Sequence, residues 1–211
     1  MRVIEEICLW IEFFIRNLPG GIGRKIRYYY YKLRLAKCGK NVVFDVGVII
    51  QNPQSVYIED NVWIDKNVIL IAGKLNHLTH ENTLGLDLMD NDKLGKIIIG
   101  SNSHIGINSI IQGHGGVVIL NNFTCSSHCK IYTLSNDVQN SLNGTFGEMN
   151  RYVLSQIFIE DNVWLGLNVS VLKGVIHKNT FIKPNSVVVS SINENSIAEG
   201  FPARVIKARF E

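Results

Sequence analysis

The sequence predicts a mainly β protein in which short strands wind into a coil of six-residue repeats. The segment that starts at Ile58 returns almost unchanged at Ile159, 101 residues later. Branched aliphatic residues also recur every six positions, often followed by Gly, Asp or Glu. A period of six fits neither the helical period of about 3.6 residues nor a plain alternating strand. Internal repetition of this kind is typical of a solenoid.

The residues that open the hexads form five groups of three, and three hexads should make one triangular turn of roughly 18 residues. Each opening residue is expected to point inward and to stack on its equivalent one coil away, which buries a continuous aliphatic column. Small residues that follow, such as Gly100 and Gly106, let the backbone turn the corner. The opening residues are Ile58, Ile64, Leu70, Ile99, Ile105, Ile111, Ile119, Cys125, Ile131, Ile159, Leu165, Val171, Ile176, Ile182 and Val188.

Residues 1–40 precede the repeats and are expected to form helices. The apolar stretch at 3–15 contains three glutamates and is too short and too charged to span a bilayer comfortably. Residues 24–40 hold seven basic residues, no acidic residue and four consecutive tyrosines. Two roles stay open: the helices cap the coil or pack on a neighbouring subunit, or they lie at an anionic membrane surface.

Composition indicates one folded, soluble core, since 46% of the 211 residues are hydrophobic and 18% are charged. Residues 1–40 hold nine Lys or Arg against three Glu, a balance of +6, whereas the remainder holds twelve against fifteen acidic residues. No nucleic-acid module is recognisable, so nucleic acid is not an expected partner. Cys8, Cys38, Cys125 and Cys129 form no CxxC pair, and the chain shows no secretory signal. They are interpreted as reduced structural thiols of a cytoplasmic protein, without a metal.

Three interruptions of the repeat each fall after the third hexad of a coil. Residues 76–96 form a long excursion, residues 113–118 stretch one hexad by two residues, and residues 137–156 form a second excursion. All three should project near one edge of the prism on successive coils. Loops gathered on a rigid scaffold are where binding and catalysis usually occur.

Several motifs resemble those of the hexapeptide-repeat acyltransferases, and more narrowly the sugar O-acetyltransferases of bacterial polysaccharide synthesis. These are the Asn-Val-Trp-Leu-Gly run at 162–166, the Asn-Ser-Val-Val run at 185–188 and the closing segment at 200–207. The resemblance covers about residues 40–211 and implies a left-handed parallel β-helix, a homotrimer and acetyl-CoA as acyl donor. It implies a β-helix domain at 41–190 and a CoA-site tail at 191–211, which follow the basic, aromatic helical segment at 1–40.

The family pattern has its catalytic histidine at the position that Asn136 occupies here. An amide cannot serve as a base at neutral pH, and losing a general base costs roughly 10²–10⁴ in rate. His114, at the corresponding corner one coil earlier, is the candidate base, and His128 is a weaker alternative. Asn108, Asn136 and Asp137 are candidate acceptor-binding residues, although turn formation would explain them equally well.

The resemblance implies that Arg204 and Lys207 hold the phosphates of CoA, for which a guanidinium and an ammonium are chemically suited. The family often has a lysine where Ser191 stands, and Lys173 is one residue that could compensate. Gly166 would let the thioester arm approach the backbone, although turning a corner would explain this glycine alone.

The sequence therefore predicts an enzyme that moves an acetyl group from acetyl-CoA to a sugar hydroxyl of a bacterial surface-polysaccharide precursor. It would act in the cytoplasm or peripherally at the inner membrane. Two alternatives remain: N-acetylation of a nucleotide-linked amino sugar, whose amine is already nucleophilic, and a non-catalytic trimeric scaffold.

Overall fold

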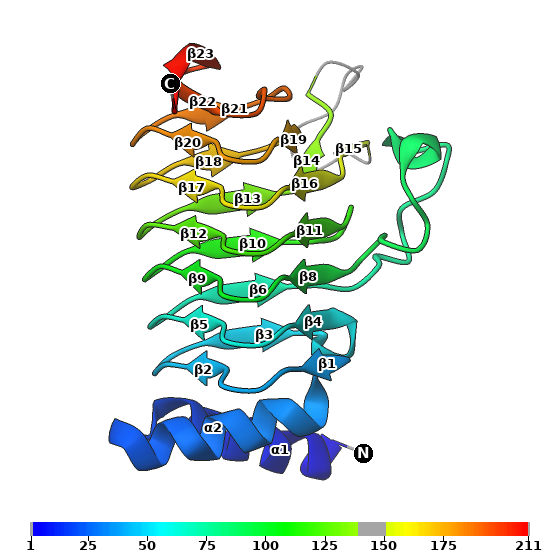
Figure 1. Ribbon diagram of the computed structural model, residues 1–211. Helices are drawn as coiled ribbons and strands as arrows, with labels where there is room; N and C mark the ends of the chain where they lie inside the picture. Colours follow the sequence, from blue (N-terminus) through cyan, green and yellow to red (C-terminus); the bar gives the residue numbers. More distant parts are fainter. Residues whose placement is uncertain (1, 139–150, 211) are drawn as a thin grey trace.

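The computed structural model describes residues 2–138 and 151–210, and it shows a prism of short strands that stands on two helices (Figure 1). Each coil of the prism contributes one strand to each of three parallel sheets. The described residues form six complete coils and a closing antiparallel hairpin. The architecture is a parallel β-helix, as the six-residue period predicts.

The three sheets are named sheet 1, sheet 2 and sheet 3. Sheet 1 contains β1 (Lys37–Cys38), β4 (Val56–Ile58), β8 (Ile97–Ile99), β11 (Val117–Ile119), β16 (Ile157–Ile159) and β19 (Gly174–Ile176). Sheet 2 contains β2 (Val43–Phe44), β5 (Trp63–Ile64), β9 (His104–Ile105), β12 (Thr124–Cys125), β17 (Trp164–Leu165), β20 (Phe181–Ile182), β22 (Ser196–Gly200) and β23 (Ala203–Ala208). Sheet 3 contains β3 (Ile49–Gln51), β6 (Ile69–Ile71), β10 (Ile110–Gln112), β13 (Lys130–Tyr132), β18 (Ser170–Val171) and β21 (Val187–Val188).

The first coil begins earlier than the sequence indicates. Strand β1 pairs with β4, so that Lys37 lies beside Tyr57, and the β-helix starts before residue 41. This coil adds a sixth turn to the five that the hexads revealed. Its inward positions are filled by Phe44 and Ile50. An aromatic residue in place of a branched aliphatic one hides the repeat in the sequence, yet it still fills the column.

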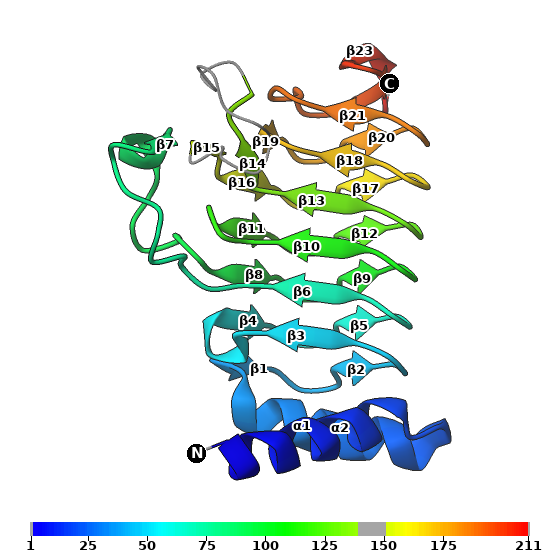
Figure 2. The same cartoon turned by 180° about the vertical axis from the view of Figure 1, so that it is seen from behind.

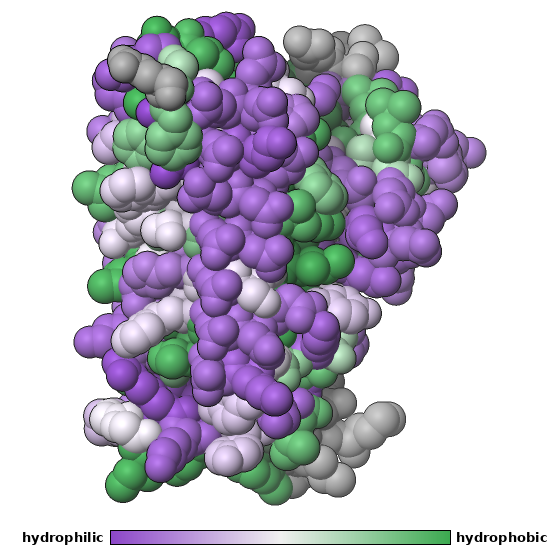
Figure 3. All heavy atoms as spheres, in the orientation of Figure 1, coloured by the Kyte–Doolittle hydropathy of each residue, from purple (hydrophilic) through white to green (hydrophobic). Residues whose placement is uncertain are grey.

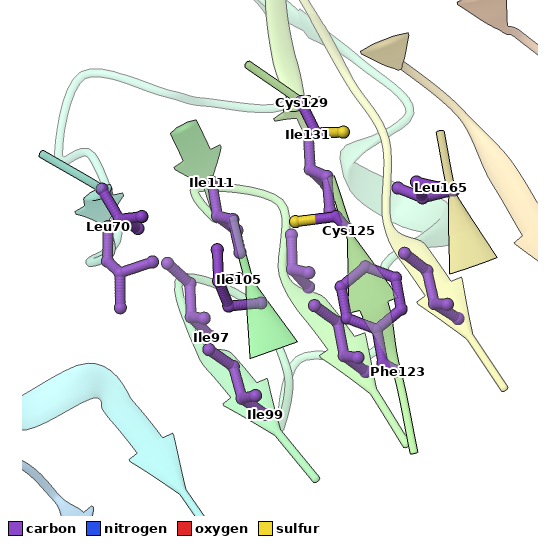
Figure 4. Packing of buried hydrophobic residues seen from close by; sticks show 14 of the residues in the cluster. Leu70, Ile97, Ile99, Ile105, Ile111, Phe123, Cys125, Cys129, Ile131 and Leu165 are labelled. Atoms are coloured by element: carbon purple, nitrogen blue, oxygen red, sulfur yellow. The ribbon is translucent and has the colours of Figure 1, made fainter. Parts of the chain in front are cut away.

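The aliphatic column runs the length of the prism. Every residue predicted to open a hexad is buried, with at most 1% of its surface exposed. Figure 4 shows the stacking in the middle coils, where Ile105 lies beside Cys125, and Ile111 beside Leu70 and Ile131. Burial of each aliphatic side chain contributes about 1.5–3 kcal/mol, so the column stabilises the fold even though each strand is only two or three residues long.

Corner residues with positive φ let the chain turn between strands. Among the described residues, twelve asparagines and His128 are the non-glycine residues with positive φ. Asparagine tolerates the left-handed region better than other non-glycine residues, because its short side chain bonds to nearby backbone. Asparagine in the hexads therefore marks the corners of the coil.

Two antiparallel helices close the lower end of the prism: α1 (Arg2–Asn17) and α2 (Gly20–Arg34). Helix α2 is fixed to the first coil by buried groups. Arg27 Nε donates to the carbonyl of Phe44 (2.8 Å), and the Tyr31 hydroxyl donates to the carbonyl of Val48 (2.9 Å). The helices thus cover the end of the β-helix. In the described part of the chain, no helix is long and apolar enough to cross a membrane.

The two long excursions meet at the edge between sheets 3 and 1, which is called the loop edge. The first contains β7 (Thr83–Leu84) and the 3₁₀ helix η2 (Leu86–Leu88), and the second starts and ends with β14 (Leu134–Asn136) and β15 (Tyr152–Leu154). These strands form one small sheet in the order β14-β15-β7. In Figures 1 and 2 this sheet stands beside the prism. Much of the predicted 137–156 excursion, residues 139–150, lies outside the described residues.

Candidate active site at the loop edge

His114 lies at the loop edge, directly after β10, with only 8% of its surface exposed. Its Nδ1 is 2.8 Å from the backbone carbonyl oxygen of Gly73, on the coil below. A carbonyl oxygen can only accept a hydrogen bond, so Nδ1 must carry the ring proton. In the neutral imidazole the other ring nitrogen, Nε2, then has a lone pair available to a ligand.

The turn around His114 requires small residues. A Cβ on Gly115 would lie 2.0 Å from the carbonyl oxygen of Ser155, and the Gly115 amide donates to Thr133 Oγ1 (2.9 Å). Gly116 has a φ of 98°, which other residues rarely adopt. The glycines beside this histidine therefore let the backbone of the turn pack closely against the next coil, which fixes the position of His114.

A pocket of about 440 Å³ lies between His114 and the first excursion. The end of the excursion is tied to this corner, because the Gly95 amide donates to the carbonyl of His114 (3.0 Å). The pocket combines polar and apolar walls, as sites for small polar molecules commonly do. Its other lining residues are Lys74, Leu75, Asn76, Leu78, His80, Leu86, Asp87, Met89, Asn91 and Leu94.

A second histidine reaches the same pocket. His80 Nδ1 lies 2.6 Å from Asp87 Oδ1, and both residues line the pocket with Lys74 and His114. The sequence gave no sign of the His80–Asp87 pair or of Lys74, since pairing within an irregular loop follows no period that a sequence reveals.

Asn136 and Asp137 follow the same edge one coil above His114. Asn136 ends β14 opposite Tyr152 of β15, and its side chain is exposed. Asp137 is 4% exposed, and its amide donates to the carbonyl of Arg151 (2.9 Å). Neither residue lines the pocket that contains His114.

Asn108 and His128 lie at a different corner, between sheets 2 and 3. Both have positive φ (58° and 65°), and their amides donate to the carbonyls of Lys66 and Ile107, one coil below each. Within one chain this corner is separate from the loop edge, and neither residue lines the His114 pocket. The structure thus brings His80 to His114, but neither Asn108 nor His128.

The residues expected to hold CoA lie on the upper coils. Lys173 lines a smaller pocket of about 110 Å³ with Thr133 and Ser155, further along the loop edge from His114. Arg204 Nη1 lies 3.4 Å from the hydroxyl of Ser190, which is at the same edge one coil higher. The two cations therefore stand on the edge that carries His114.

Lys207 and Gly166 complete the expected CoA set. Lys207 is exposed on β23, beside Ile197 of β22. A Cβ on Gly166 would lie 2.7 Å from the backbone nitrogen of Pro184, so coil packing alone requires this glycine. Gly166 lies at the junction of sheets 2 and 3, and its carbonyl accepts a hydrogen bond from the buried Cys129 thiol (3.2 Å).

The cysteines are free thiols, as the sequence indicated. Cys125 and Cys129 are buried in the aliphatic column, where the hydrogen bond to the Cys129 sulfur and desolvation raise the pKa of Cys125 (Figure 4). Burial raises the pKa of Cys38 to about 11. In the described ranges no group of three or more His, Cys, Asp or Glu side chains could hold a metal ion.

No family model matches the chain, but individual proteins do. A protein of Saccharomyces cerevisiae named for an inferred acetyltransferase activity is 38% identical over 114 residues, which are 53% of this chain and 55% of the relative. A protein of Escherichia coli, named for an inferred O-acetyl transferase activity in lipopolysaccharide biosynthesis, is 48% identical over 54 residues, 25% of this chain and 28% of the relative. The chain thus spans about half or less of the length of these relatives.

Solved structures match over most of the chain. The N-acyltransferase AntD of Bacillus cereus, with dTDP-4-amino-4,6-dideoxyglucose and coenzyme A, has a TM-score of 0.70 at 23% identity, covering 88% of this chain and 90% of AntD. A hexapeptide-repeat acetyltransferase of Vibrio cholerae with acetyl coenzyme A has a TM-score of 0.60 at 16% identity, covering 95% and 84%.

The fold is therefore the left-handed parallel β-helix of hexapeptide-repeat proteins. The two relatives and two structural neighbours described above are named for acetyl or acyl transfer, and the Vibrio cholerae protein is named for its hexapeptide repeats.

Proposed function

We propose that this protein transfers an acetyl group from acetyl-CoA to a sugar hydroxyl of a bacterial surface-polysaccharide precursor. The sequence similarity to an O-acetyl transferase named for lipopolysaccharide biosynthesis supports the acceptor class. The coenzyme A and acetyl coenzyme A in the structural neighbours support the donor.

One observation carries the proposal: the hydrogen bond between His114 Nδ1 and the Gly73 carbonyl orients the ring in the wall of a pocket, so that in the neutral imidazole Nε2 is the nitrogen that can accept a proton. In the proposed reaction Nε2 accepts the proton of the acceptor hydroxyl while the oxygen forms a bond to the thioester carbonyl carbon. Collapse of the resulting tetrahedral species breaks the carbon–sulfur bond, and the proton passes to the leaving thiolate. The Gly73 carbonyl stabilises the imidazolium that forms in between.

The cations of the upper coils are proposed to hold the donor. Lys173 and Arg204 share the loop edge with His114, and their charge suits the phosphates of CoA. Gly166 and Lys207 are proposed to contact the donor as well. Asn108, Asn136 and Asp137 are proposed to bind the acceptor, and Asn108 would need a neighbouring subunit in order to reach the site.

The proposed setting is the cytoplasm or the inner membrane face, with the enzyme assembled as a homotrimer. Within one chain the corners that carry Asn108 and His114 lie apart, and a trimer would allow these corners of different copies to meet. The proposed division of the chain is a helical segment, a β-helix domain with two excursions and a CoA-site tail.

A second candidate is N-acetylation of a nucleotide-linked amino sugar. The structural similarity to AntD, whose complex contains an amino sugar linked to dTDP, favours it. An amine is already nucleophilic at neutral pH, so this reaction depends less on a base at the position of Asn136.

The test is an assay of free thiol release from acetyl-CoA, with the wild-type protein and the His114→Gln variant. Glutamine keeps a polar side chain but cannot accept the proton, so kcat/KM with a sugar hydroxyl should fall by about 10²–10⁴. His104→Gln is the matched control, because His104 lies on sheet 2 and pairs with Asp65 away from the pocket. An unchanged rate in His114→Gln would overturn the assignment of the base.

The choice of acceptor is tested by comparing an amino sugar nucleotide with its hydroxyl counterpart. Faster turnover of the amine would favour N-acetylation. Absence of acetyl-CoA binding by calorimetry would favour the third alternative, a non-catalytic trimeric scaffold.

A further inference from the structure

Helix α1 packs on the protein through its polar side. Glu12 accepts hydrogen bonds from the Tyr30 hydroxyl (3.0 Å) and from Arg34 (2.7 Å), both on α2. The opposite side of α1 carries Trp10 and Phe14, which are 60% and 61% exposed. A surface helix normally buries its apolar side and exposes its polar side. Helix α1 instead leaves its aromatic residues exposed.

The exposed side chains of α1 contact mainly one another. The ring centroids of Trp10, Phe13 and Phe14 lie 5.7 to 6.5 Å apart, so the three rings form a cluster on one helix. Ile7 extends this cluster by one turn and is 53% exposed. Such a cluster leaves a large apolar area in water, which is costly unless a partner covers it.

Helix α2 adds a second apolar row. Its buried side, with Arg27 and Tyr31, faces the prism. Four other residues recur at spacings of four, three and four, which places them on one stripe turned away from the prism. All four are exposed, from 39% to 88%: Ile22, Ile26, Tyr29 and Leu33.

The cluster of α1 and the stripe of α2 together are called the apolar foot. Figures 1 and 2 show the two helices lying side by side across the lower end of the prism. Figure 3 shows this end from the side, where apolar side chains are interspersed with polar ones. The foot is therefore a broad surface at the end of the molecule, not a groove along its side.

Basic residues surround the foot. Lys25 and Lys32 are exposed on α2, and neither has a carboxylate partner among the described residues. Arg16, at the end of α1, lies over the Phe13 ring. Residues 1–40 as a whole carry nine basic side chains against three acidic ones. This excess opposes the docking of a second copy by the same surface, but it attracts an anionic surface.

We propose that the apolar foot binds the surface of an anionic lipid bilayer. Trp10, Phe14 and Leu33 enter the boundary between headgroups and acyl chains, where aromatic rings are favoured. Lys25 and Lys32 contact lipid phosphates. Two helices that lie in the plane of the surface fit this mode of binding, which needs no membrane-spanning segment. The prism then stands upright on the membrane, with the His114 pocket at a fixed height on its third coil.

Vesicle co-sedimentation of the full chain tests this proposal. We expect binding to vesicles of phosphatidylcholine mixed with phosphatidylglycerol, and much weaker binding to phosphatidylcholine alone. Trp10→Ser with Phe14→Ser should weaken binding about a hundredfold, since each large apolar side chain contributes about tenfold or more. Lys25→Glu with Lys32→Glu should weaken binding to the anionic vesicles by more than about tenfold, and added salt should do the same.

Matched controls separate this surface from general effects. Phe210→Ser removes an exposed ring at the other end of the chain, and Lys66→Glu with Lys178→Glu reverses two exposed charges on the prism. Both should bind like the wild type. Trp10→Phe should also bind. Quenching of Trp10 fluorescence by brominated acyl chains reports insertion of this side chain directly, and it should be lost in Trp10→Phe.

Failure of the wild-type protein to bind anionic vesicles would overturn the proposal. Unchanged vesicle binding by both the double serine variant and the double glutamate variant of the foot would also overturn the proposal. If Trp10→Ser with Phe14→Ser instead reduces the oligomeric state without lipid, the foot is covered by a second copy. None of these readouts depends on acetyl transfer, so they test membrane binding independently of the proposed activity.

Discussion

At the scale of single residues, the corners of the coil set a strict conformational demand. The column of corners between sheets 2 and 3 contains Asn67, Asn108, His128 and Asn168, each with positive φ and each donating its amide to the coil below. Histidine is the exception in this column. His128 is exposed, and its carbonyl, not its ring, accepts a hydrogen bond from Lys130 Nζ (3.1 Å).

His128→Asn should therefore stabilise the protein. Asparagine adopts the left-handed conformation at a lower cost, and the gain should be about 0.5–1 kcal/mol. For a chain of this size that corresponds to a rise in Tm of about 1–4 °C, measurable by thermal unfolding. His128→Val, which adds a β-branched side chain at positive φ, should lower Tm. If His128→Asn abolishes acetyl transfer while it stabilises the fold, His128 replaces His114 as the candidate base.

At the scale of elements, helix α2 is held by buried polar groups rather than by a large apolar contact. Tyr31 is 1% exposed, its ring packs against Phe44 at 4.8 Å, and its hydroxyl donates to Val48. Arg27 is fully buried, and one of its nitrogens lies 4.0 Å from Asp45. Burial raises the pKa of Tyr31, because the phenolate would lose its hydration.

This pKa shift predicts a loss of stability at alkaline pH. Below about pH 10 the tyrosine is neutral in both states. As the pH rises beyond that value the unfolded chain releases the proton while the folded protein retains it. The free energy of unfolding should then fall by about 1.4 kcal/mol per pH unit. Tm measured between pH 9 and 11 should drop more steeply in the wild type than in Tyr31→Phe. Parallel curves for the two proteins would show that Tyr31 does not control this loss.

At the scale of the whole molecule, the sequence predicts the repetitive part of the structure and little else. The hexads reveal the column, because each inward side chain must stack on its equivalent, and they place the interruptions at one edge. The first coil escaped prediction because Phe44 breaks the aliphatic pattern. The His80–Asp87 pair and the hydrogen bond between His114 and Gly73 could not be predicted, since both depend on how an irregular excursion folds back onto the coil.

The joining of the two excursions is a property of the whole molecule, and a cross-link can test it. Leu84 of β7 pairs with Val153 of β15. Both side chains are partly exposed, at 52% and 37%. Paired residues of neighbouring strands have Cα atoms about 4.7–4.9 Å apart, within the usual range for a disulfide. Leu84→Cys with Val153→Cys should therefore form an intramolecular disulfide under mild oxidation, in a background where the exposed Cys8 is replaced by Ser.

The cross-link should form without a change of fold, and it should keep the first excursion against the edge that carries His114. Non-reducing electrophoresis after proteolysis identifies the bond, and the two single-cysteine variants control for links between molecules. Because the link closes a loop of about 70 residues in the unfolded chain, it should raise the free energy of unfolding by up to about 4 kcal/mol. A double variant whose thiols stay free would show that the excursions move apart in solution.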